Sequence, residues 1–234
     1  ERRRFINMML SQTDPEYLKN SMQYNRLLKQ RNLLLKQDAI STLLLDTITE
    51  QLSLPALYIF QKRKEAVEKL NECTAKFYQM ISGGKESVSI EYLSDLFEDM
   101  PIALFEKSRS KDLLFKYTTA GIQRDDLRFL MNGHPLKKCA SQGQQKSFLV
   151  ALKMAQYRIM NQMYGVTPML LLDDLFDKLD HSRVKALINT VLEESFGQVF
   201  ITDTDRRRVE DIVRNITDQG KYFNVVSGVF TEER

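Results

Sequence analysis

The sequence has few of the residues that build covalent or metal-stabilised sites. It contains no tryptophan, two cysteines and two histidines among 234 residues. Cys73 and Cys139 lie in different segments, and neither has a metal-ligand spacing to His134 or His181. The composition therefore argues against a disulfide framework and against a zinc site.

Long apolar runs are absent as well. No stretch approaches the roughly 20 consecutive apolar residues that a membrane helix needs, and no signal peptide precedes the first helical pattern. We expect a soluble, cytoplasmic protein with no membrane partner. With 43% apolar and 28% charged residues, the chain can bury the core of one domain or of two small ones. It opens without methionine, inside a helical pattern, and this predicts a fragment of a longer protein.

Glycine is scarce, and its placement excludes one common phosphate-binding motif. The loop G-x-x-x-x-G-K-[ST] holds ATP phosphates between a strand and a helix. Gly83-Gly84-Lys85-Glu86 is not a substitute, because it ends a predicted helix. None of the nine glycines forms the motif, since they stand at positions 83, 84, 121, 133, 143, 165, 197, 220 and 228. We expect that this chain alone does not bind or hydrolyse ATP appreciably.

Residues 1–112 predict an α-helical lobe. Apolar residues recur at helical spacing in a segment rich in Leu, Lys, Gln and Glu. We expect a largely helical segment over residues 17–54, divided near residues 37–38 and interrupted by Pro55. A second helix over residues 56–81 should pack antiparallel against the first.

The lobe should also contain a small strand insertion. The turn at residues 82–84 ends the preceding helix. Val88, Ile90 and Tyr92 then alternate with polar neighbours and predict a short strand. Residues 101–111 predict another helix.

Residues 113–234 predict an α/β fold with a mostly parallel sheet. Asn132-Gly133 favours a tight hairpin turn. Ser141 precedes a helix with an apolar stripe, and residues 169–172 form an apolar run expected to be a strand buried on both faces. Helices and strands then alternate: a helix over residues 181–194, a strand over 198–201, a helix near 206–216 and a strand around 222–226.

Two carboxylates follow the apolar run directly. A buried strand that ends in Asp173-Asp174 resembles the way in which nucleotide hydrolases place a magnesium ligand beside an acid that positions water. Asp173 would hold Mg²⁺, and Asp174 would orient or deprotonate the attacking water. Alone, the pattern is equally compatible with an ordinary helix cap.

The segment Ser141-Gln142-Gly143-Gln144-Gln145 lies just before a long helix. A helix start offers unpaired backbone N–H groups and a positive dipole end, which suit a phosphate. A simple N-cap is the alternative for a lone serine. The later strand that ends in two aspartates favours the phosphate interpretation.

Three segments resemble a known family. Ser141-Gln142-Gly143-Gln144-Gln145, then Leu170–Asp174, then Phe176-Asp177-Lys178-Leu179-Asp180 resemble the signature, Walker B and D-loop segments of RecF, an ABC ATPase family related to the SMC proteins. Residues 2–5 and 24–32 resemble its first helices. Gly121–Leu127 resembles a further RecF segment, in which Ile122-Gln123 replaces the usual Pro-His.

The resemblance implies a fold and a division into domains. Residues 113–234 would be the C-terminal half of an ABC ATPase head. Residues 1–112 would be a helical lobe, whose start belongs to a missing N-terminal part that carries the phosphate loop. In the intact protein, the signature would close on ATP held by a second protomer, so ATP and Mg²⁺ would support a homodimer with slow hydrolysis. RecF proteins tend to carry a threonine-rich segment where this chain has Thr202-Asp203, and these two residues are therefore candidates near the γ-phosphate.

The same resemblance implies ATP-dependent binding to double-stranded and gapped DNA, with RecR and RecO as partners in recombinational repair. Basic side chains on one face could contact phosphates, although most charge runs are only solvated faces. The main candidates are Arg31, Lys36, Lys62, Arg63 and Lys64.

Two other function classes remain open. A structural SMC-like head would extend its helices into a coiled coil of hundreds of residues, and the breaks at Pro55 and Gly83 indicate a shorter arm. A helical DNA-binding module without a nucleotide role would leave Ser141-Gln142-Gly143 and Asp173-Asp174 without a purpose.

Overall fold

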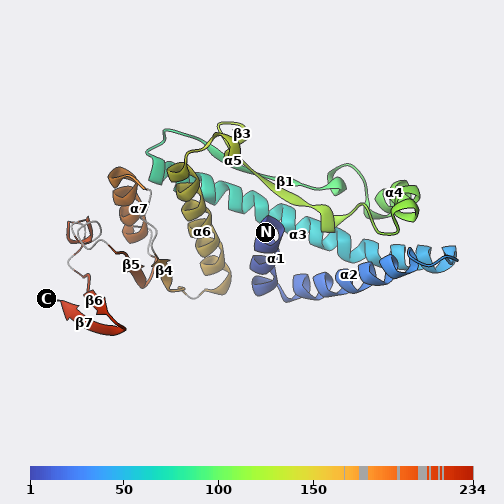
Figure 1. The fold of residues 1–234 in the computed structure, drawn as a ribbon, viewed down its shortest axis with the longest axis horizontal. Coiled ribbons are helices and arrows are strands. Elements are labelled where there is room, and N and C mark those ends of the chain that lie inside the picture. Colours follow the sequence, from blue (N-terminus) through green and yellow to red (C-terminus); the bar gives the residue numbers. More distant parts are fainter. Residues whose placement is uncertain are drawn as a thin grey trace. The chain divides into compact units, whose positions relative to one another are not determined.

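The computed structural model describes residues 1–165, 167–173, 179–193, 196–204, 210, 212–215, 217 and 219–233. The chain forms two compact units (Figure 1). Unit 1 comprises Glu1–Cys73 and Ser89–Pro135, and unit 2 comprises Thr74–Val88 and Leu136–Arg234. The boundary expected at residues 112/113 thus lies inside unit 1. No described helix combines the length and apolarity needed to span a membrane.

Unit 1 is built on three helices: α1 (Arg2–Thr13), α2 (Pro15–Leu34) and α3 (Thr42–Ser82). Asp14 separates the first two, because its carboxylate accepts a hydrogen bond from the Tyr17 N–H at 2.9 Å and caps α2. The same carboxylate accepts from the Tyr58 hydroxyl of α3 at 3.2 Å. At the other end of α2, Arg31 contacts Thr49. Helices α2 and α3 are therefore antiparallel, as predicted, and the predicted division near residues 37–38 falls between them (Figure 1).

Helix α3 corrects one expectation. It has 41 residues and contains Pro55 in its interior, so the predicted interruption at this proline is wrong. A proline inside a helix removes one backbone hydrogen bond. Pro55 is buried between the fully buried Leu52 and Ala56, and this tertiary packing outweighs the local penalty. The helix ends at Ser82, and Gly83 and Gly84 follow with positive φ, as the predicted turn requires.

A small three-stranded sheet completes unit 1, with strand order β1-β2-β3. Its strands are β1 (Val88–Leu93), β2 (Asp126–Met131) and β3 (His134–Pro135). Between β1 and β2 lie the short helix η1 (Asp95–Phe97), α4 (Pro101–Phe115) and the short helix η2 (Ile122–Arg124). Asn132 and Gly133 adopt φ values of 48° and 78°, which form the predicted two-residue hairpin turn. The predicted strand insertion and helix are confirmed.

Unit 2 contains α5 (Leu136–Cys139), α6 (Gln142–Tyr164) and α7 (His181–Glu193), together with the last residues of α3. The Tyr157 ring of α6 lies 4.6 Å from the Phe196 ring, and Phe196 lies 5.9 Å from Phe77 of α3. The Tyr157 hydroxyl donates to the Pro168 carbonyl at 2.6 Å. The apolar stripe of α6 is buried at Phe148, Leu152, Ala155 and Ile159, whereas Met163 at its end is exposed.

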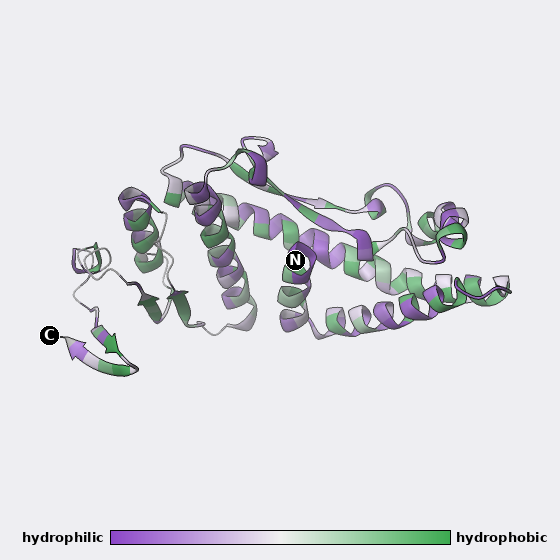
Figure 2. Cartoon of the chain, viewed as in Figure 1, coloured by the Kyte–Doolittle hydropathy of each residue, from purple (hydrophilic) through white to green (hydrophobic). Residues whose placement is uncertain are grey.

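The strands β4 (Leu170–Asp173) and β5 (Val199–Thr202) pair in parallel, and β6 (Tyr222–Val226) pairs with β7 (Val229–Glu233) in an antiparallel hairpin. Residues 170–172 of β4 and 199–201 of β5 are all apolar (Figure 2). Leu172 is 5% exposed but Leu171 is 70% exposed, so the expectation that β4 is buried on both faces is wrong. Only one face of this strand is covered by the described residues.

The strand β7 was not predicted from the sequence. Ser227 and Gly228 have φ values of 51° and 80°, the backbone of a second two-residue hairpin turn. The helix predicted near residues 206–216 lies largely outside the described residues. Helices with small sheets, including the parallel pair, confirm the α/β class.

Candidate functional site

The carboxyl ends of β4 and β5 bring two predicted site residues together. Asp173 pairs in register with Thr202, and the Thr202 hydroxyl donates a hydrogen bond to Oδ1 of Asp173. Both side chains are exposed, and Asp203 follows directly. Apolar residues place these strands side by side in parallel, so the polar residues that follow them gather at one edge. Asp174 lies outside the described residues.

The oxygen atoms at this edge suit a hard cation. Magnesium in phosphate-transfer sites is usually held by one or two carboxylates, with phosphates and water as further ligands. Asp173 supplies one carboxylate, and the bond from Thr202 orients it. Within the described part of the chain there is no cluster of three or more His, Cys, Asp or Glu side chains that could hold a metal.

Ser141 caps α6, which was the alternative interpretation of this residue. Its hydroxyl oxygen accepts from the Gln144 N–H at 3.2 Å, and the Gln144 side-chain oxygen accepts from the Ser141 N–H at 2.7 Å. This reciprocal capping box satisfies two backbone donors. Ser141 and Gln142 remain exposed at the positive end of a 23-residue helix. The geometry is that of an N-cap, and it leaves the Ser141 side chain accessible to an anion.

The side chains of the other signature residues turn toward the protein. The Gln145 amide nitrogen donates to the Ala140 carbonyl at 2.9 Å, and that of Gln144 donates to Oε1 of Glu86 at 2.8 Å. Gly143 has no side chain. Apart from Ser141 and Gln142, the segment would therefore reach a phosphate through its backbone.

Asp180 of the predicted D-loop lies at the start of α7. Its Oδ1 accepts from the Ser182 hydroxyl at 2.5 Å and from the Arg183 N–H at 2.9 Å, which makes Asp180 the N-cap of this helix. These hydrogen bonds, from Ser182 first and then from Arg183, lower the pKa of the Asp180 carboxyl below its ordinary value. Phe176, Asp177 and Lys178 of the same segment lie outside the described residues.

Two residues of this region were missed by sequence reasoning. Glu86 follows the turn that ends α3, and Arg183 stands three residues after Asp180. Nη2 of Arg183 lies 3.2 Å from Oε1 of Glu86, and both side chains are 13% exposed. Both residues are visibly charged in the sequence, but neither belongs to a motif that would identify the other as its partner.

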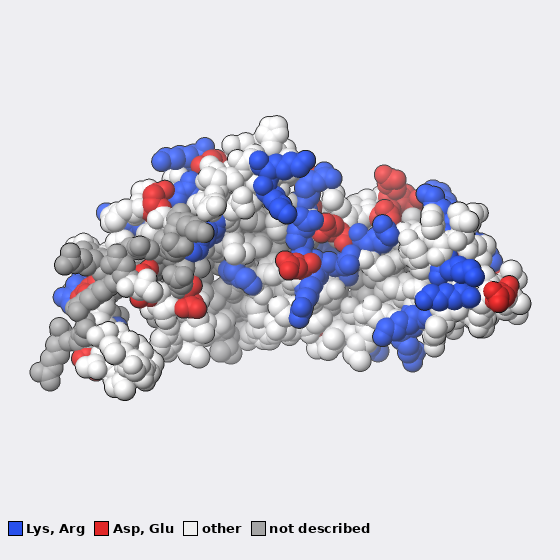
Figure 3. Space-filling model, viewed as in Figure 1, with Lys and Arg blue, Asp and Glu red and all other residues white. Residues whose placement is uncertain are grey.

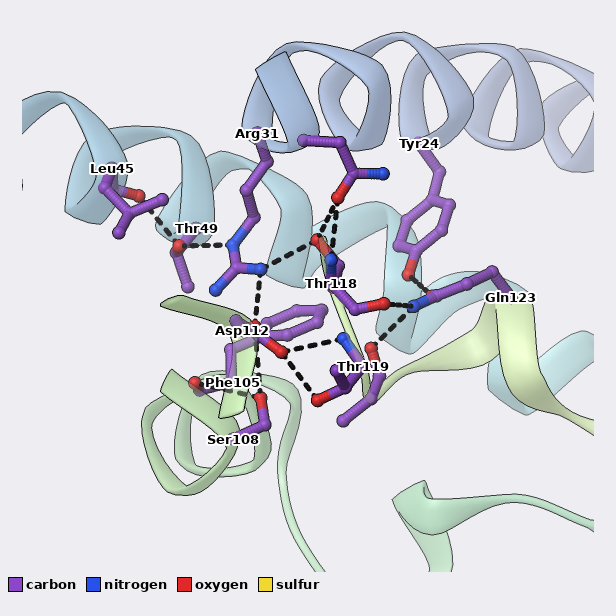
Figure 4. A network of polar contacts seen from close by, with 12 residues as sticks. Tyr24, Arg31, Leu45, Thr49, Phe105, Ser108, Asp112, Thr118, Thr119 and Gln123 are labelled. Carbon is purple, nitrogen blue, oxygen red and sulfur yellow. Dashed lines mark hydrogen bonds and ion pairs between the residues drawn. The ribbon is translucent and has the colours of Figure 1, made fainter. Parts of the chain in front are cut away.

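The basic DNA candidates separate by burial. Arg31 is 1% exposed, and Nη1 of its guanidinium lies 2.7 Å from Oδ2 of Asp112 and 2.7 Å from Oγ1 of Thr118. Its Nε donates to Thr49, and the Phe105 ring lies beside the guanidinium (Figure 4). A buried charge that is already paired cannot reach a phosphate, so the assignment of Arg31 to DNA binding is corrected.

Arg63 is corrected for the same reason. It is 4% exposed, and its Nη1 donates to Oδ2 of Asp125 at 2.6 Å and to the Ile122 carbonyl at 2.8 Å. Tyr92 donates to the same Asp125 oxygen at 2.5 Å. Burial raises the pKa of Asp125, and the neighbouring Arg63 opposes that shift. The pair joins α3 to the segment before β2 and has a structural role.

Three lysines remain as candidates for phosphate contact. Lys36 and Lys64 are exposed, while Lys62 is half-buried, with its Nζ 3.6 Å from Oδ2 of Asp14. Basic side chains form several separate groups on the face seen in Figure 3, and acidic side chains lie beside some of them.

The segment Gly121–Leu127 also has a structural role. Gln123, which stands where the family usually has histidine, accepts a hydrogen bond from the Tyr24 hydroxyl, and its amide donates to the Ala120 carbonyl at 2.7 Å (Figure 4). Gly121 has φ of 112°, and a Cβ there would lie 2.9 Å from the Tyr24 hydroxyl oxygen. This residue therefore needs to be glycine.

Comparison with known proteins identifies the relatives of the chain. No protein-family model matches it. The DNA replication and repair protein RecF of Flavobacterium johnsoniae is 44% identical over 228 residues, which cover 96% of this chain and 64% of that protein. The chain is a homologue of the RecF proteins. RecF of Parabacteroides distasonis is 40% identical over 97% of the chain, and RecF of Porphyromonas gingivalis is 41% identical over 97%. The chain spans 62% and 63% of these two relatives, less than two thirds of their length.

Solved structures agree with the RecF relationship. A structure of the recombination mediator protein RecF-ATP in the RecFOR pathway matches the whole chain with a TM-score of 0.79 at 27% identity, and the match covers 62% of that protein. A RecF-ATPrS structure matches 99% of the chain, and 62% of that protein, with a TM-score of 0.78 at 29% identity. The Smc head domain of Pyrococcus furiosus shares the fold, with a TM-score of 0.51 at 15% identity over the whole chain and 56% of that protein. The predicted ABC ATPase head fold is thus confirmed.

Proposed function

We propose that this chain supplies the signature, Walker B and D-loop segments of an ATP-dependent DNA-binding ATPase that acts in replication and recombinational repair. The observation that carries the proposal is the parallel β4–β5 edge, where Thr202 donates to the carboxylate of Asp173. Such an edge collects oxygen ligands beside the place where a nucleotide phosphate binds in open α/β sheets. RecF relatives with DNA replication and repair in their names, and a RecF-ATP structure, support the same conclusion.

Each residue at the edge has a proposed role. Asp173 would hold Mg²⁺, which when bound neutralises charge on the β- and γ-phosphate oxygens. Asp174 would orient the attacking water and accept its proton. Thr202 keeps Asp173 in place, and Asp203 lies next to it, near the proposed position of the γ-phosphate.

Ser141 would act on ATP held by a second protomer. The nine glycines form no phosphate loop, so the nucleotide must be held by residues outside this chain. The exposed start of α6 offers the Ser141 hydroxyl, backbone N–H groups and a helix dipole to the γ-phosphate. ATP would thereby join two protomers, and hydrolysis would release them.

The dimer would bind double-stranded and gapped DNA. Phosphate contacts require accessible cations, and Lys36 and Lys64 are exposed while Lys62 is half-buried. RecR and RecO are the proposed protein partners, and the RecFOR pathway named for the solved RecF structures supports them. An SMC-like role with an extended coiled coil is less well supported, because the longest described helix has 41 residues.

Dimerisation of the full-length protein tests the proposal. Light scattering with ATP should show a dimer for the unaltered protein and a longer-lived dimer for Asp174→Asn, which retains ATP. Ser141→Arg should weaken the ATP-dependent dimer about 100-fold, since about 2.7 kcal/mol corresponds to two factors of ten.

A matched control is available at Ser41, an exposed serine just before α3 whose hydroxyl accepts from the Leu44 N–H at 3.4 Å. Ser41→Arg adds the same charge before a helix and should leave the dimer unchanged. If Ser141→Arg and Asp174→Asn both behaved like the unaltered protein, the ATPase proposal would be rejected, and a helical DNA-binding module would explain the chain better.

A further inference from the structure

Glu86 is a meeting point of three segments of unit 2. It lies between α3 and β1, after the turn at Gly83 and Gly84. Its Oε1 accepts from the Gln144 side chain of α6 at 2.8 Å, and the same oxygen lies 3.2 Å from Nη2 of Arg183 in α7. The Tyr78 hydroxyl of α3 donates to Oε2 at 3.4 Å. One carboxylate therefore holds side chains from two helices that carry different predicted motifs.

On the signature side, the contacts continue to the motif itself. The Gln144 side chain that reaches Glu86 also closes the capping box on Ser141. Nη1 of Arg183 donates to the Ser147 hydroxyl at 3.0 Å, and that hydroxyl donates to the Gly143 carbonyl at 2.9 Å.

On the D-loop side, Arg183 reaches the residue that begins its own helix. Its Nε lies 3.4 Å from Oδ2 of Asp180, and its backbone N–H donates to Oδ1 of Asp180. The Arg183 guanidinium thus contacts the D-loop, Glu86 and the signature helix at once. A planar fork of five N–H donors allows this, and a lysine could not reproduce it.

Burial makes the arrangement specific. The side chains of Glu86 and Arg183 are each 13% exposed, whereas Asp180 is 61% exposed. A largely desolvated, charge-assisted pair is stronger and more directional than a surface pair, and removal of one partner leaves a poorly solvated charge.

We infer that Glu86 and Arg183 are positioning residues that fix the signature segment and Asp180, the last residue of the D-loop segment, in one geometry. The inference rests on the proposed function, in which the signature acts on ATP held by the second protomer. Pre-organisation lowers the cost of ordering both segments when two protomers meet. The pair acts through Ser141, Gly143 and Asp180 and does not touch the nucleotide.

The test uses the full-length protein with Glu86→Ala, Arg183→Ala and the double variant. The ATP-dependent dimer should dissociate about 10-fold more readily in each single variant, and the double variant should be no weaker than the weaker single one, because the two residues act as a unit. ATP binding by the isolated protomer, followed with a fluorescent ATP analogue at low protein concentration, should change less than about twofold, because the signature closes only on the partner's nucleotide.

A purely structural role would lower protomer ATP binding and dimerisation together with the unfolding temperature, and this result would overturn the inference. If the alanine variants are too unstable, Glu86→Gln preserves size and Arg183→Lys preserves charge, and each should give a graded weakening of the dimer. Dimers as tight as the unaltered one in these two variants would also overturn it.

Two controls separate this inference from the proposed function. Arg128 and Glu91 form an exposed pair with a separation of 3.3 Å, and Arg128→Ala should leave the dimer unchanged. Ser141→Arg tests the proposed function directly. If Ser141→Arg abolishes the dimer while the Glu86 and Arg183 variants do not weaken it, only the positioning role fails. If neither Ser141→Arg nor Asp174→Asn changes the dimer, the proposed function fails.

Discussion

The candidate site residues of the two units differ in burial. In unit 1, Arg31 and Arg63 are buried, and each is bonded to an aspartate that is also buried. In unit 2, Asp173, Asp180 and Ser141 are exposed and are held in place by hydrogen bonds to one or two neighbours. The charges of these two buried pairs are satisfied within the protein, whereas these three residues of unit 2 retain capacity for a ligand. Burial therefore separates structural residues from candidate site residues better than residue type does.

The largest effect should come from the buried pairs of unit 1. Arg63→Met leaves Asp125 buried without its cation, and we expect a loss of about 3–5 kcal/mol in the free energy of unfolding. Urea unfolding of the full-length protein measures this loss. The double change Arg63→Met with Asp125→Leu should recover much of it. A loss below about 1 kcal/mol for Arg63→Met would contradict the structural role and reopen Arg63 as a surface cation.

Substitution of one glycine in each unit tests how closely the surrounding residues are packed. Gly121 in unit 1 has φ of 112° and close neighbours, whereas Gly165 in unit 2 has φ of 63°, and a Cβ added there would meet nothing within 4 Å. Gly121→Ala should cost about 2–3 kcal/mol from backbone strain and overlap, and Gly165→Ala about 1 kcal/mol from strain alone. Thermal unfolding of both variants checks the order. Equal costs would show that local packing does not distinguish the sites.

The three candidate lysines should affect DNA affinity more than stability. We expect about 5-fold weaker duplex binding, or about 1 kcal/mol, for each of Lys36→Ala, Lys62→Ala and Lys64→Ala. Each change should also reduce the slope of log K against log salt concentration by about one. Fluorescence anisotropy at several salt concentrations provides the measurement. Lys185→Ala, an exposed lysine of α7, is the control. If a variant that combines all three changes had an unchanged salt slope, these lysines would be excluded as phosphate contacts.

The smallest effect concerns pH. The pKa of Asp180 is lowered by the hydrogen bonds it accepts from Ser182 and Arg183. Its stabilising contribution is therefore complete above the ordinary value of 3.8 and is lost as pH falls through the lower folded value. Asp180→Asn should cost less than about 1 kcal/mol at pH 7, because asparagine also caps helices. It should also flatten the decline of stability below about pH 4, as unfolding temperature against pH would show.

Much of the fold followed from local sequence patterns. The start of α6 at Ser141, the hairpin turn at Asn132-Gly133 and the end of α3 at Gly83 are each determined by neighbouring residues. Such features depend on backbone donors and on φ, which a short segment specifies by itself. The segments that carry the RecF resemblance were also found from the sequence, because each is a contiguous run of residues.

The errors concern long-range packing. Arg31 bonds to Asp112 at a separation of 81 residues, and Arg63 to Asp125 at 62 residues. No local pattern distinguishes such an arginine from a solvated one. Pro55 was expected to break a helix because propensity is local, yet the helix continues through it. The contact of Glu86 with Arg183, separated by 97 residues, was missed for the same reason.

Glu86 accounts for the identity of one residue in the capping box of α6. A capping box accepts either Gln or Glu at the position of Gln144, and the positive end of a helix would favour Glu. A single base change converts a glutamine codon to a glutamate codon. That change would place two carboxylates side by side, because the Gln144 amide donates to Glu86 at 2.8 Å. The helix start alone would accept glutamine or glutamate at this position. The carboxylate of Glu86, 58 positions earlier in the chain, favours the neutral glutamine.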